Sequence, residues 1–552
     1  MIFQNKFKFF SKITTLFIII FFSCYMVAKV SFSKNSNQSI KLDVKKAVQS
    51  KILDVNFGNN KADIVVYFVD KKGLEKNWLK HSNTDYVAKI KYKKFEATKG
   101  QLIDLDFAKG KQIILVGVDN DKKDLKKEKN NIELDFAKAG ASVVNVLPKG
   151  QNVNVLFSNK YIENKEFKQD SLLVEAYFGF NQKYYRFDKY ITNKEEKEKK
   201  TVVNSIILDA SENNEIKKLI KTKQNQLEGI FYIRELGNEP ANVVYPETMA
   251  DEIKKAFVGI KNTKVKVLNK KDIEKLGMNM LLGVAQGSVK EPKVVVVEYL
   301  GNPKQKTYDL ALIGKGVCFD SGGLSLKPSQ YMEGMKGDML GAATILSSTL
   351  SLAKNGVKAN IVAVAGLVEN MPDGNAQKVG DIVKSMSGKT VEIIDTDAEG
   401  RLVLGDILYY AQTTYKPEYM IDMATLTGAI MVALGLERAG IFTNNETLGN
   451  AIKKSGDKSG DKCWVMPMGE EYADAMKSQI ADLRNLSSVR YAGSATAAAF
   501  LENFIDDNKK WAHIDIAGVD NATKNSPFGV ADFASGFGLK LLNEFVKTEI
   551  EK

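Results

Sequence analysis

The sequence contains few of the residues on which several enzyme classes depend. It has only two histidines, His81 and His513, which excludes a zinc protease of the HExxH type. Its three cysteines, Cys24, Cys318 and Cys463, show neither CxxC spacing nor an even-numbered framework. Neither a disulfide scaffold nor a cysteine-based zinc site is therefore expected. Any chemistry has to rest on other side chains.

Positive charge is in excess, but it is not concentrated. The 79 Lys+Arg outnumber the 67 Asp+Glu and give a net charge of +12, which can serve a nucleic acid or an anionic surface. The lysines occur in runs such as 122–129 and 194–200, with no interleaved aromatic residues and no helix-turn-helix or zinc-knuckle spacing. We interpret them as solvated surface, and we expect no nucleic-acid partner.

A long uncharged run occurs only at the N-terminus. Residues 13–28 follow Lys6, Lys8 and Lys12 and end at Lys29. This pattern is typical of a signal peptide or a short membrane anchor. A third alternative is that translation begins at Met26, which would remove the run. The three alternatives stay open, and membrane contact is expected only if the segment is retained.

Length and hydrophobic pattern predict an α/β protein of two domains, each a mixed or parallel sheet flanked by helices. A chain of 552 residues is too long for one hydrophobic core. Apolar runs that alternate with helix-like stretches favour a largely parallel sheet in the first domain. There we expect a helix at 131–141 and strands at 62–69, 112–118, 142–147 and 152–157.

The rest of the chain completes this division. We predict an apolar segment at 1–30, a polar linker at 31–50, an N-terminal α/β domain at 51–192, a charged loop and connecting helix at 193–237, and a second α/β domain at 238–552. The connecting helix is expected at 215–236, with Gly237 as its C-cap. In the second domain we expect a helix at 339–354 and strands at 264–267, 293–299, 308–313, 360–365, 390–394 and 419–424.

Two segments of the second domain combine strands with acidic residues. Ligands of open α/β sheets bind outside the carboxyl ends of the strands. In YDLALIGKGVCFDSGGLSLKP (308–328), a strand ending near Ile313 is expected to run into a glycine-rich turn with Lys315, Asp320 and Lys327. In TVEIIDTDAEGRL (390–402), a strand ending at Asp395 is followed by Asp397, Glu399 and Arg401.

These carboxylates are candidate metal ligands. In an extended conformation Asp397 and Glu399 would leave the same face, where they repel unless a cation or a proton intervenes. Asp338, in MKGDMLGAA, and Asp320 bring the number to four, for which two divalent ions about 3.5–4 Å apart are the usual solution. Oxygen ligands suit Mg, Mn or Ca and also serve Zn. Alternatively, the acids cap helices and form ion pairs with the neighbouring lysines and arginine.

The amino-acid sequences of these segments resemble the signature blocks of the leucyl aminopeptidase (cytosol aminopeptidase) family. GKGVCFDSGGLSLKP, MKGDMLGAA and DTDAEGRL carry the resemblance. Further blocks agree in order and spacing over about 230–540: RELGNEPANVVYP, GMNMLLGVAQGS, MATLTGAIMVALG, GSATAAAFL and WAHIDIAG. In the N-terminal domain the resemblance is weaker, chiefly FGFNQKYYRFDKYIT at 178–192.

The resemblance implies a two-metal aminopeptidase in the C-terminal domain. Such an enzyme binds two divalent ions per subunit, Mn²⁺ or Zn²⁺, and removes N-terminal residues, often leucine, from peptides with a free N-terminus. The family implies a homo-hexamer in the cytoplasm with a role in intracellular peptide turnover, whereas the apolar N-terminus leaves export or anchoring open.

The resemblance also assigns individual residues. One ion would be held by Lys315, Asp320, Asp338 and Glu399, with the lysine as an uncharged amine. The other ion would be held by Asp320, Asp397 and Glu399. The catalytic residues would be Lys327 and Arg401, the latter holding a bicarbonate. Leu426 and Gly428, in ATLTG, would contact bound substrate.

Three positions differ from the usual sequence pattern of the family. Asp395 stands where the family has Asn, Gly337 fills a variable position, and VDNAT follows WAHIDIAG in place of TAW. None of these removes a metal ligand or a catalytic residue, so we expect activity.

Other functions fit the sequence less well. Gly314-x-Gly316 lacks the third glycine of a dinucleotide fingerprint, and 387–390 lacks the first glycine of a P-loop. Ser321 lacks the elbow of a triad hydrolase, and we interpret His513 as a packed core histidine. The remaining rival is a catalytically weak binding protein on this fold, which uses its basic N-terminal half for nucleic acid or membrane. The intact ligand set favours the enzyme.

Overall fold

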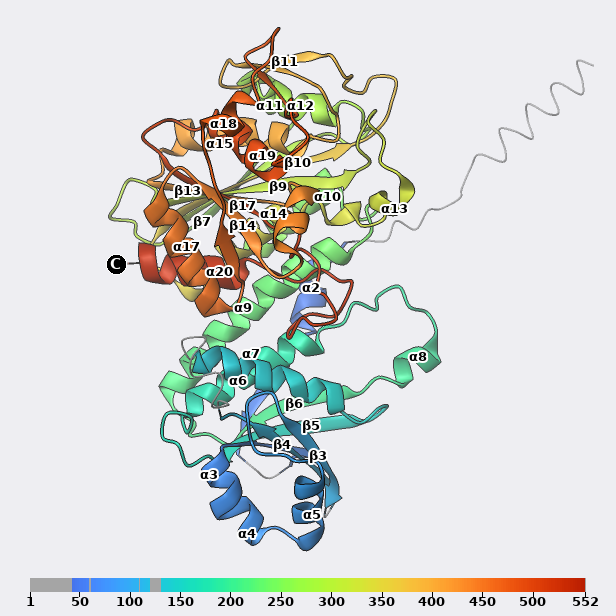
Figure 1. Ribbon diagram of the computed structural model, residues 1–552, viewed down its shortest axis with the longest axis vertical. Helices are drawn as coiled ribbons and strands as arrows, with labels where there is room; N and C mark the ends of the chain where they lie inside the picture. The colour runs from blue at the N-terminus through green and yellow to red at the C-terminus, as the bar shows by residue number, and fades with distance from the viewer. Residues whose placement is uncertain (1–41, 59–60, 109, 120–130, 552) are drawn as a thin grey trace, which may run out of the picture. The chain divides into compact units, whose positions relative to one another are not determined.

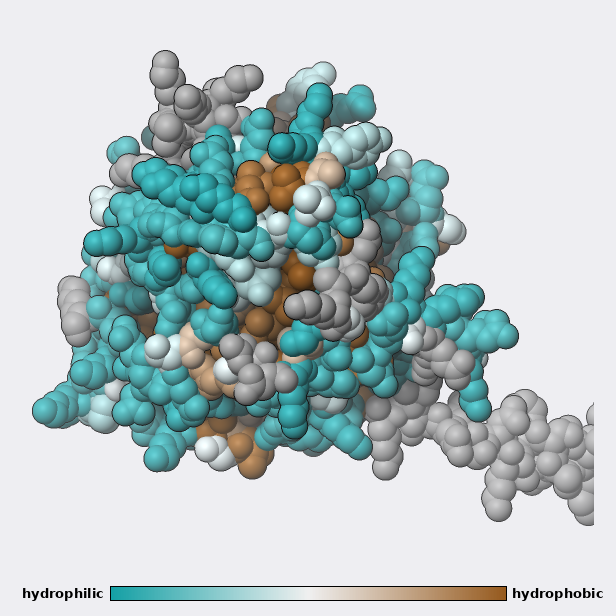
Figure 2. Space-filling view, turned by 90° about the horizontal axis from the view of Figure 1, so that it is seen from below, coloured by the Kyte–Doolittle hydropathy of each residue, from teal (hydrophilic) through white to brown (hydrophobic). Residues whose placement is uncertain are grey.

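The structure is a computed structural model that describes residues 42–58, 61–108, 110–119 and 131–551 (Figure 1). The predicted apolar segment 1–30 and the lysine run 122–129 lie outside these residues. From Asp43 onward the chain forms one compact unit. No helix in the described part combines the length and apolarity that a membrane span requires. The surface in Figure 2 is mostly hydrophilic, with small hydrophobic areas between the polar side chains.

The first sheet has six strands in the order β1-β6-β5-β2-β4-β3. Their bounds are β1 Asp54–Phe57, β2 Ile64–Val69, β3 Leu102–Ala108, β4 Lys111–Gly117, β5 Asn152–Tyr161 and β6 Val202–Leu208. All neighbouring strands are parallel except β3, which is antiparallel to β4. The predicted largely parallel sheet is confirmed.

Two helices of this region pack closely against each other. Each of α6 (Ile132–Val143) and α7 (Asp170–Tyr184) contributes a glycine where the backbones meet, and a Cβ on Gly140 would lie 2.0 Å from the carbonyl oxygen of Ala176. The strand predicted at 142–147 is wrong. Its residues end α6 and form the 3-10 helix η3 (Val144–Val146), because Val143 continues the buried face of α6.

The charged and polar segments at 31–50 and 193–200 contain helices that the sequence did not predict. Helix α2 (Val44–Gln49) buries Val44 and Val48, and the Val44 N–H donates to Glu252 Oε2 over 3.1 Å. Residues 44–49 are therefore not a linker. Helix α8 (Lys194–Glu198) lies within the predicted loop.

The connecting helix α9 spans Asn214–Asn238 and confirms the prediction of a helix at 215–236. Gly237 is not its C-cap. That position belongs to Glu239, because Pro240 has no N–H with which to continue the helix. Gly237 lies inside α9, where a Cβ would come within 2.6 Å of Leu340 Cδ2 on α14 (Leu340–Asn355).

The second sheet has eight strands in the order β15-β14-β17-β13-β9-β10-β8-β7, and β17, β13, β9 and β10 run parallel at its centre. Their bounds are β7 Thr263–Leu268, β8 Lys293–Leu300, β9 Leu310–Asp320, β10 Asn360–Asn370, β13 Tyr419–Ala424, β14 Ala439–Thr443, β15 Cys463–Val465 and β17 Lys510–Asp515. The edge strand β7, its neighbour β8 and strand β14 introduce antiparallel pairings. A mixed sheet was predicted and is confirmed.

Helices cover both faces of this sheet (Figure 1). On β9, Gly314 faces α14, where a Cβ would lie 2.6 Å from Ala342 Cα. The adjacent Ile313 joins the hydrophobic cluster beneath α15 (Gly400–Tyr415), because successive strand residues point to opposite faces.

The remaining helices fall into two groups. Those of the second region are α10 Pro246–Phe257, α11 Lys270–Leu276, α12 Asn279–Ala285, α13 Ser329–Met332, η4 Met335–Gly337, α16 Gly428–Leu434, α17 Glu446–Ser459, α18 Glu470–Asp474, α19 Gly493–Glu502, α20 Leu539–Phe545 and η5 Val546–Ile550. Those of the first region are α3 Lys71–Gly73, η1 Leu74–Trp78, α4 Leu79–His81 and α5 Thr84–Tyr92.

Two predicted strand ends near the candidate residues are wrong. Strand β9 does not end near Ile313 but pairs with β10 as far as Asp320, so that Lys315 lies within the strand. The turn begins only at Gly322 and Gly323, whose φ angles of +88° and +65° favour glycine. The strand predicted at 390–394 ends at Glu392, and it belongs to a separate three-stranded sheet of β11 Ile382–Lys384, β12 Thr390–Glu392 and β16 Leu483–Arg484.

Candidate metal centre

Asp320 is held at the carboxyl end of β9 by its neighbours. It pairs in register with Asn370, the last residue of β10. Its Oδ1 accepts hydrogen bonds from Asn370 Nδ2 and from the Gly322 N–H, each over 2.9 Å. The tight turn after β9 therefore fixes the direction of the carboxylate, while Oδ2 remains for other partners.

Asp397 and Glu399 reach Asp320 from a loop that precedes α15. The expectation of an extended segment is wrong, because Glu399 already has helical backbone angles, φ −82° and ψ −36°, as the N-cap of α15. Thr396 fastens the loop by donating from Oγ1 to the carbonyl oxygen of Gly322 over 2.7 Å. Asn485 holds its other side by accepting from the Ile394 N–H over 2.7 Å.

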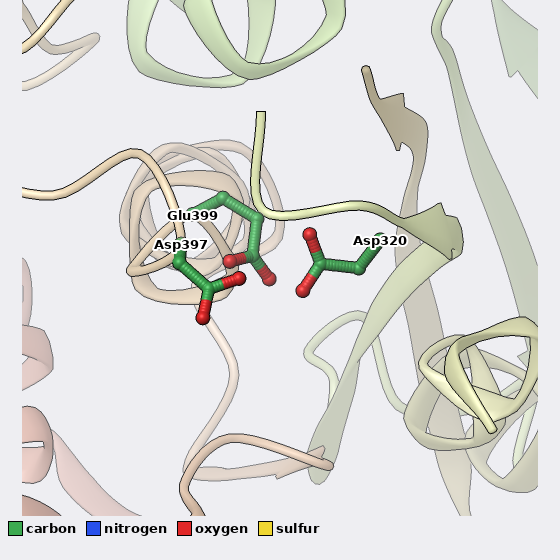
Figure 3. Close-up of side chains that lie close together, drawn as sticks. All are labelled: Asp320, Asp397 and Glu399. Carbon is green, nitrogen blue, oxygen red and sulfur yellow. The ribbon is translucent and has the colours of Figure 1, made fainter. Parts of the chain in front are cut away.

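The three carboxylates point toward one another (Figure 3). Each offers an oxygen that lies within 4.8 Å of the oxygens of the other two. Asp320 and Glu399 are each only 2% exposed, whereas Asp397 is partly exposed. Three acidic groups at this separation form a site that could hold a cation.

Lys315 and Asp338 complete the group on one side. Lys315 Nζ lies 2.8 Å from Asp338 Oδ1 and 2.9 Å from Glu399 Oε1, and it donates to the carbonyl oxygen of Thr425 over 2.9 Å. Thr425 Oγ1 donates to Asp338 Oδ1 over 2.7 Å. Asp338 Oδ2 is buried, and no residue in the described part of the chain forms a hydrogen bond with it. The structure thus brings all five predicted metal ligands together.

The two predicted catalytic residues lie in different settings. Lys327 Nζ lies 2.9 Å from Asp320 Oδ2 and 2.5 Å from Asp397 Oδ1. Arg401, on the first turn of α15, is only 6% exposed, yet its Nε and Nη1 have no hydrogen-bond partner, and the described residues give it no ion pair. The ion pairs that the alternative interpretation proposed therefore form at both lysines but not at the arginine.

The cationic side chains around the acidic groups compensate their charge only in part. Burial, followed by the charge of Asp320, raises the pKa of Glu399 to about 8. Burial also raises the pKa of Asp338 to about 6, although Lys315 opposes the change. Burial alone would lower the pKa of Lys315, but the surrounding carboxylates outweigh it and raise that pKa. The site holds more negative charge than its two ammonium groups neutralise, which favours an added cation.

The predicted substrate contacts lie beside this group. Leu426 directly follows Thr425, and its N–H donates to Asp515 Oδ1 over 3.1 Å. Gly428 begins α16, whose N-cap Thr427 donates from Oγ1 to Asp515 Oδ2 over 2.6 Å. Asp515 ends β17, the strand next to β13, and so holds this loop at the carboxyl edge of the sheet.

Sequence reasoning missed several supporting residues. Asn370 and Asp515 both end central strands, and their position at carboxyl strand ends was the available signal. His513 is a buried core histidine, as predicted, with Nδ1 2.6 Å from Asp422 Oδ1. Asp395, which stands where the family has Asn, accepts a hydrogen bond from the Asp397 N–H over 2.9 Å.

Comparisons with known proteins agree with this geometry. The profile of the cytosol aminopeptidase family, catalytic domain, matches residues 231–543. The chain is 46% identical over 369 residues to a probable cytosol aminopeptidase of Rickettsia bellii, covering 67% of this chain and 73% of the relative. It is 40% identical over 526 residues to that of Phytoplasma australiense, covering 95% and 99%. Among solved structures, the bottromycin maturation enzyme BotP in complex with Mn matches with a TM-score of 0.75 at 27% identity, covering 88% of this chain and 99% of that one.

Proposed function

The chain belongs to the cytosol aminopeptidase family of metal-dependent exopeptidases, and from this premise we propose that it releases N-terminal residues, leucine among them, from peptides with a free α-amino group. The observation that carries the proposal is the convergence of four carboxylates and the Lys315 amine at the carboxyl edge of the second sheet. The domain at 238–552 would then be catalytic and the domain at 51–192 accessory.

We propose that two divalent ions, Mn²⁺ or Zn²⁺, are held here. Lys315, Asp320, Asp338 and Glu399 would bind one ion, and Asp320, Asp397 and Glu399 the other. Such ions, when bound, supply Lewis acidity and lower the pKa of water at the site. Two observations support the fit: the unpartnered Oδ2 of buried Asp338, and the surplus of negative charge. A cation beside Lys315 would also displace its proton, because it would offset the carboxylates that raise the amine pKa.

Lys327 is suited to stabilise developing charge. Its ammonium group lies at the partly exposed side of the centre, between Asp320 and Asp397. Those carboxylates raise its pKa in spite of burial, so the group stays protonated. Once cations neutralise the carboxylates, the ammonium can donate to a carbonyl oxygen that becomes negative in the transition state.

Arg401 is suited to hold a bicarbonate. Its buried guanidinium presents two donors without partners, and a planar fork matches a planar anion. Bound there, the anion would supply a base for the proton that water loses. Neither histidine is placed for this task, because His513 lies in the core against Asp422 and His81 lies on α4 of the first region. Bicarbonate should therefore raise the turnover of bicarbonate-depleted protein but not that of Arg401→Ala.

We further propose a homo-hexamer that acts on peptides inside the cytoplasm. Large apolar side chains exposed on the described surface support assembly, among them Val432, Val489 and Tyr491. The names of the curated relatives support the compartment.

The test uses the purified full chain with a leucyl chromogenic amide. Turnover is expected with added Mn²⁺ and should be lost with a chelator. The N-acetyl-leucyl amide should resist cleavage because it has no free amine, and Glu399→Ala should lose both activity and bound metal. An assembled, metal-saturated protein without leucyl turnover would refute the proposal.

A further inference from the structure

A loop after β17 brings one more acidic side chain to the metal centre. The loop is fixed to the segment before α20. Ser535 Oγ donates to the carbonyl oxygen of Val519 over 2.6 Å, and the Ser535 N–H donates to that of Asp520 over 2.8 Å. Arg234, fully buried on α9, in turn donates from Nη2 to the carbonyl oxygen of Ser535 over 2.9 Å. The position of Asp520 is therefore set by the fold.

The carboxylate of Asp520 lies close to Gly337, the residue before Asp338. A Cβ placed on Gly337 would lie 3.9 Å from Asp520 Oδ2. Burial raises the pKa of Asp520, and the negative charge of Asp338 acts in the same direction. Lys327 occupies the other side of the centre, against Asp320 and Asp397. Asp520 thus flanks the centre on the Asp338 side.

Asp520 has no cationic partner of its own. Its side chain accepts hydrogen bonds from the adjacent Asn521, from N–H over 2.7 Å and from Nδ2 over 3.2 Å. Among the described residues no lysine or arginine forms an ion pair with it. The neighbouring Lys336 donates instead to the carbonyl oxygen of Asn238, over 2.6 Å. An ionised, partly buried carboxylate near another carboxylate is unfavourable unless a cation or a proton joins it.

We infer that Asp520 determines specificity by favouring a substrate whose N-terminal residue is arginine or lysine. The inference rests on the proposed function, which places the substrate α-amine at the metal centre. The side chain of that residue is attached to the same α-carbon as the amine. It therefore extends among the groups that flank the metal centre. Gly337 has no side chain to separate Asp338 from Asp520, and a guanidinium can pair with a carboxylate through two hydrogen bonds.

The experiment compares arginyl, citrullyl and leucyl chromogenic amides with the full-length, manganese-loaded protein. Citrulline has nearly the shape of arginine but no charge, so the ratio of the two kcat/KM values isolates the charge preference. We expect the wild type to favour the arginyl amide by about tenfold, the size of a moderately buried charge pair. Asp520→Asn should bring the ratio close to one.

A matched control keeps the test specific. Asp507→Asn removes the same charge from an exposed side chain and should retain the wild-type ratio. Asp520→Lys should instead favour a glutamyl amide over a glutaminyl amide. Leucyl turnover with equal arginyl and citrullyl kcat/KM values in the wild type would overturn this inference and leave the proposed function standing. Absence of turnover with all three amides would overturn both.

Discussion

Asp406 lies in the middle of α15 and should make the stability of the protein depend on pH. Its side chain is fully buried, and its two oxygens accept hydrogen bonds from the Leu281 and Met386 N–H groups over 3.0 and 2.8 Å. No cation of the described chain forms an ion pair with it. Burial raises the pKa of Asp406 from 3.8 to about 7, although these hydrogen bonds oppose the change.

The sign of the effect follows from proton binding. The unfolded chain releases the Asp406 proton near pH 3.8, whereas the folded protein keeps it until about pH 7. Between these values the folded state binds more protons, so the contribution of Asp406 to the free energy of unfolding falls as pH rises and is constant above that window. The change from 3.8 to about 7 corresponds to a loss of about 4 kcal/mol.

The variant Asp406→Asn removes this titration and keeps the shape. Its amide places an N–H₂ group against one of the two backbone N–H donors, which costs about 1–3 kcal/mol at every pH. Relative to wild type, the variant should therefore be less stable near pH 4 and should gain up to about 4 kcal/mol by pH 8. Groups that titrate in both proteins cancel in the difference.

The assay is denaturant unfolding of both proteins at a series of pH values, with the same manganese concentration throughout. The quantity of interest is the difference in free energy of unfolding between variant and wild type. The control is Asp507→Asn, which changes an exposed side chain in the same way. Its difference in free energy of unfolding from wild type should depend little on pH. Parallel curves for wild type and Asp406→Asn would refute the reasoning, because they would show that Asp406 ionises alike in both states.

Further predictions concern the metal centre. Lys327→Ala should lower kcat by about 10²–10³-fold, the effect of losing one oxyanion donor, with metal content unchanged by elemental analysis; loss of metal would make the lysine structural. Asn370→Ala removes a hydrogen bond to Asp320 and should weaken manganese affinity by about 10–100-fold in a calorimetric titration. Gly400→Ala should also weaken it, because the new Cβ would lie 2.5 Å from Lys315 Cε, whereas Gly374→Ala meets nothing within 4 Å and should bind metal normally.

The sequence predicted most of the large sheet because its strands are continuous apolar runs. The strand predicted at 419–424 matches β13, and the helix predicted at 339–354 matches α14 within one residue. The failures occurred where tertiary contacts decide. The valines at 143–146 have a high strand propensity, but they extend α6 because that helix packs on α7.

Local patterns identified the acidic residues but not how they meet. The spacing of Asp397 and Glu399 suggested one face of a strand, yet a turn before α15 brings them together. The segment between Ile313 and Asp320 was predicted to be a turn because of its glycines. Those at 314 and 316 instead lie in β9, where α14 and β10 leave no room for a side chain. Only the fold contains that information.

The details of the site decide between a metal centre and a structural network of ion pairs. A network built only for stability is expected to satisfy the hydrogen bonds of its buried members, since each unsatisfied polar group costs free energy. Here Asp338 Oδ2 and two nitrogens of Arg401 are buried without hydrogen-bond partners among the described residues, and burial raises the pKa of Glu399. Gly400 leaves room for the Lys315 amine to reach the carboxylates, although that amine only partly neutralises them. Cations and a small anion that bind among these groups would satisfy them, which explains why the fold leaves them unpaired.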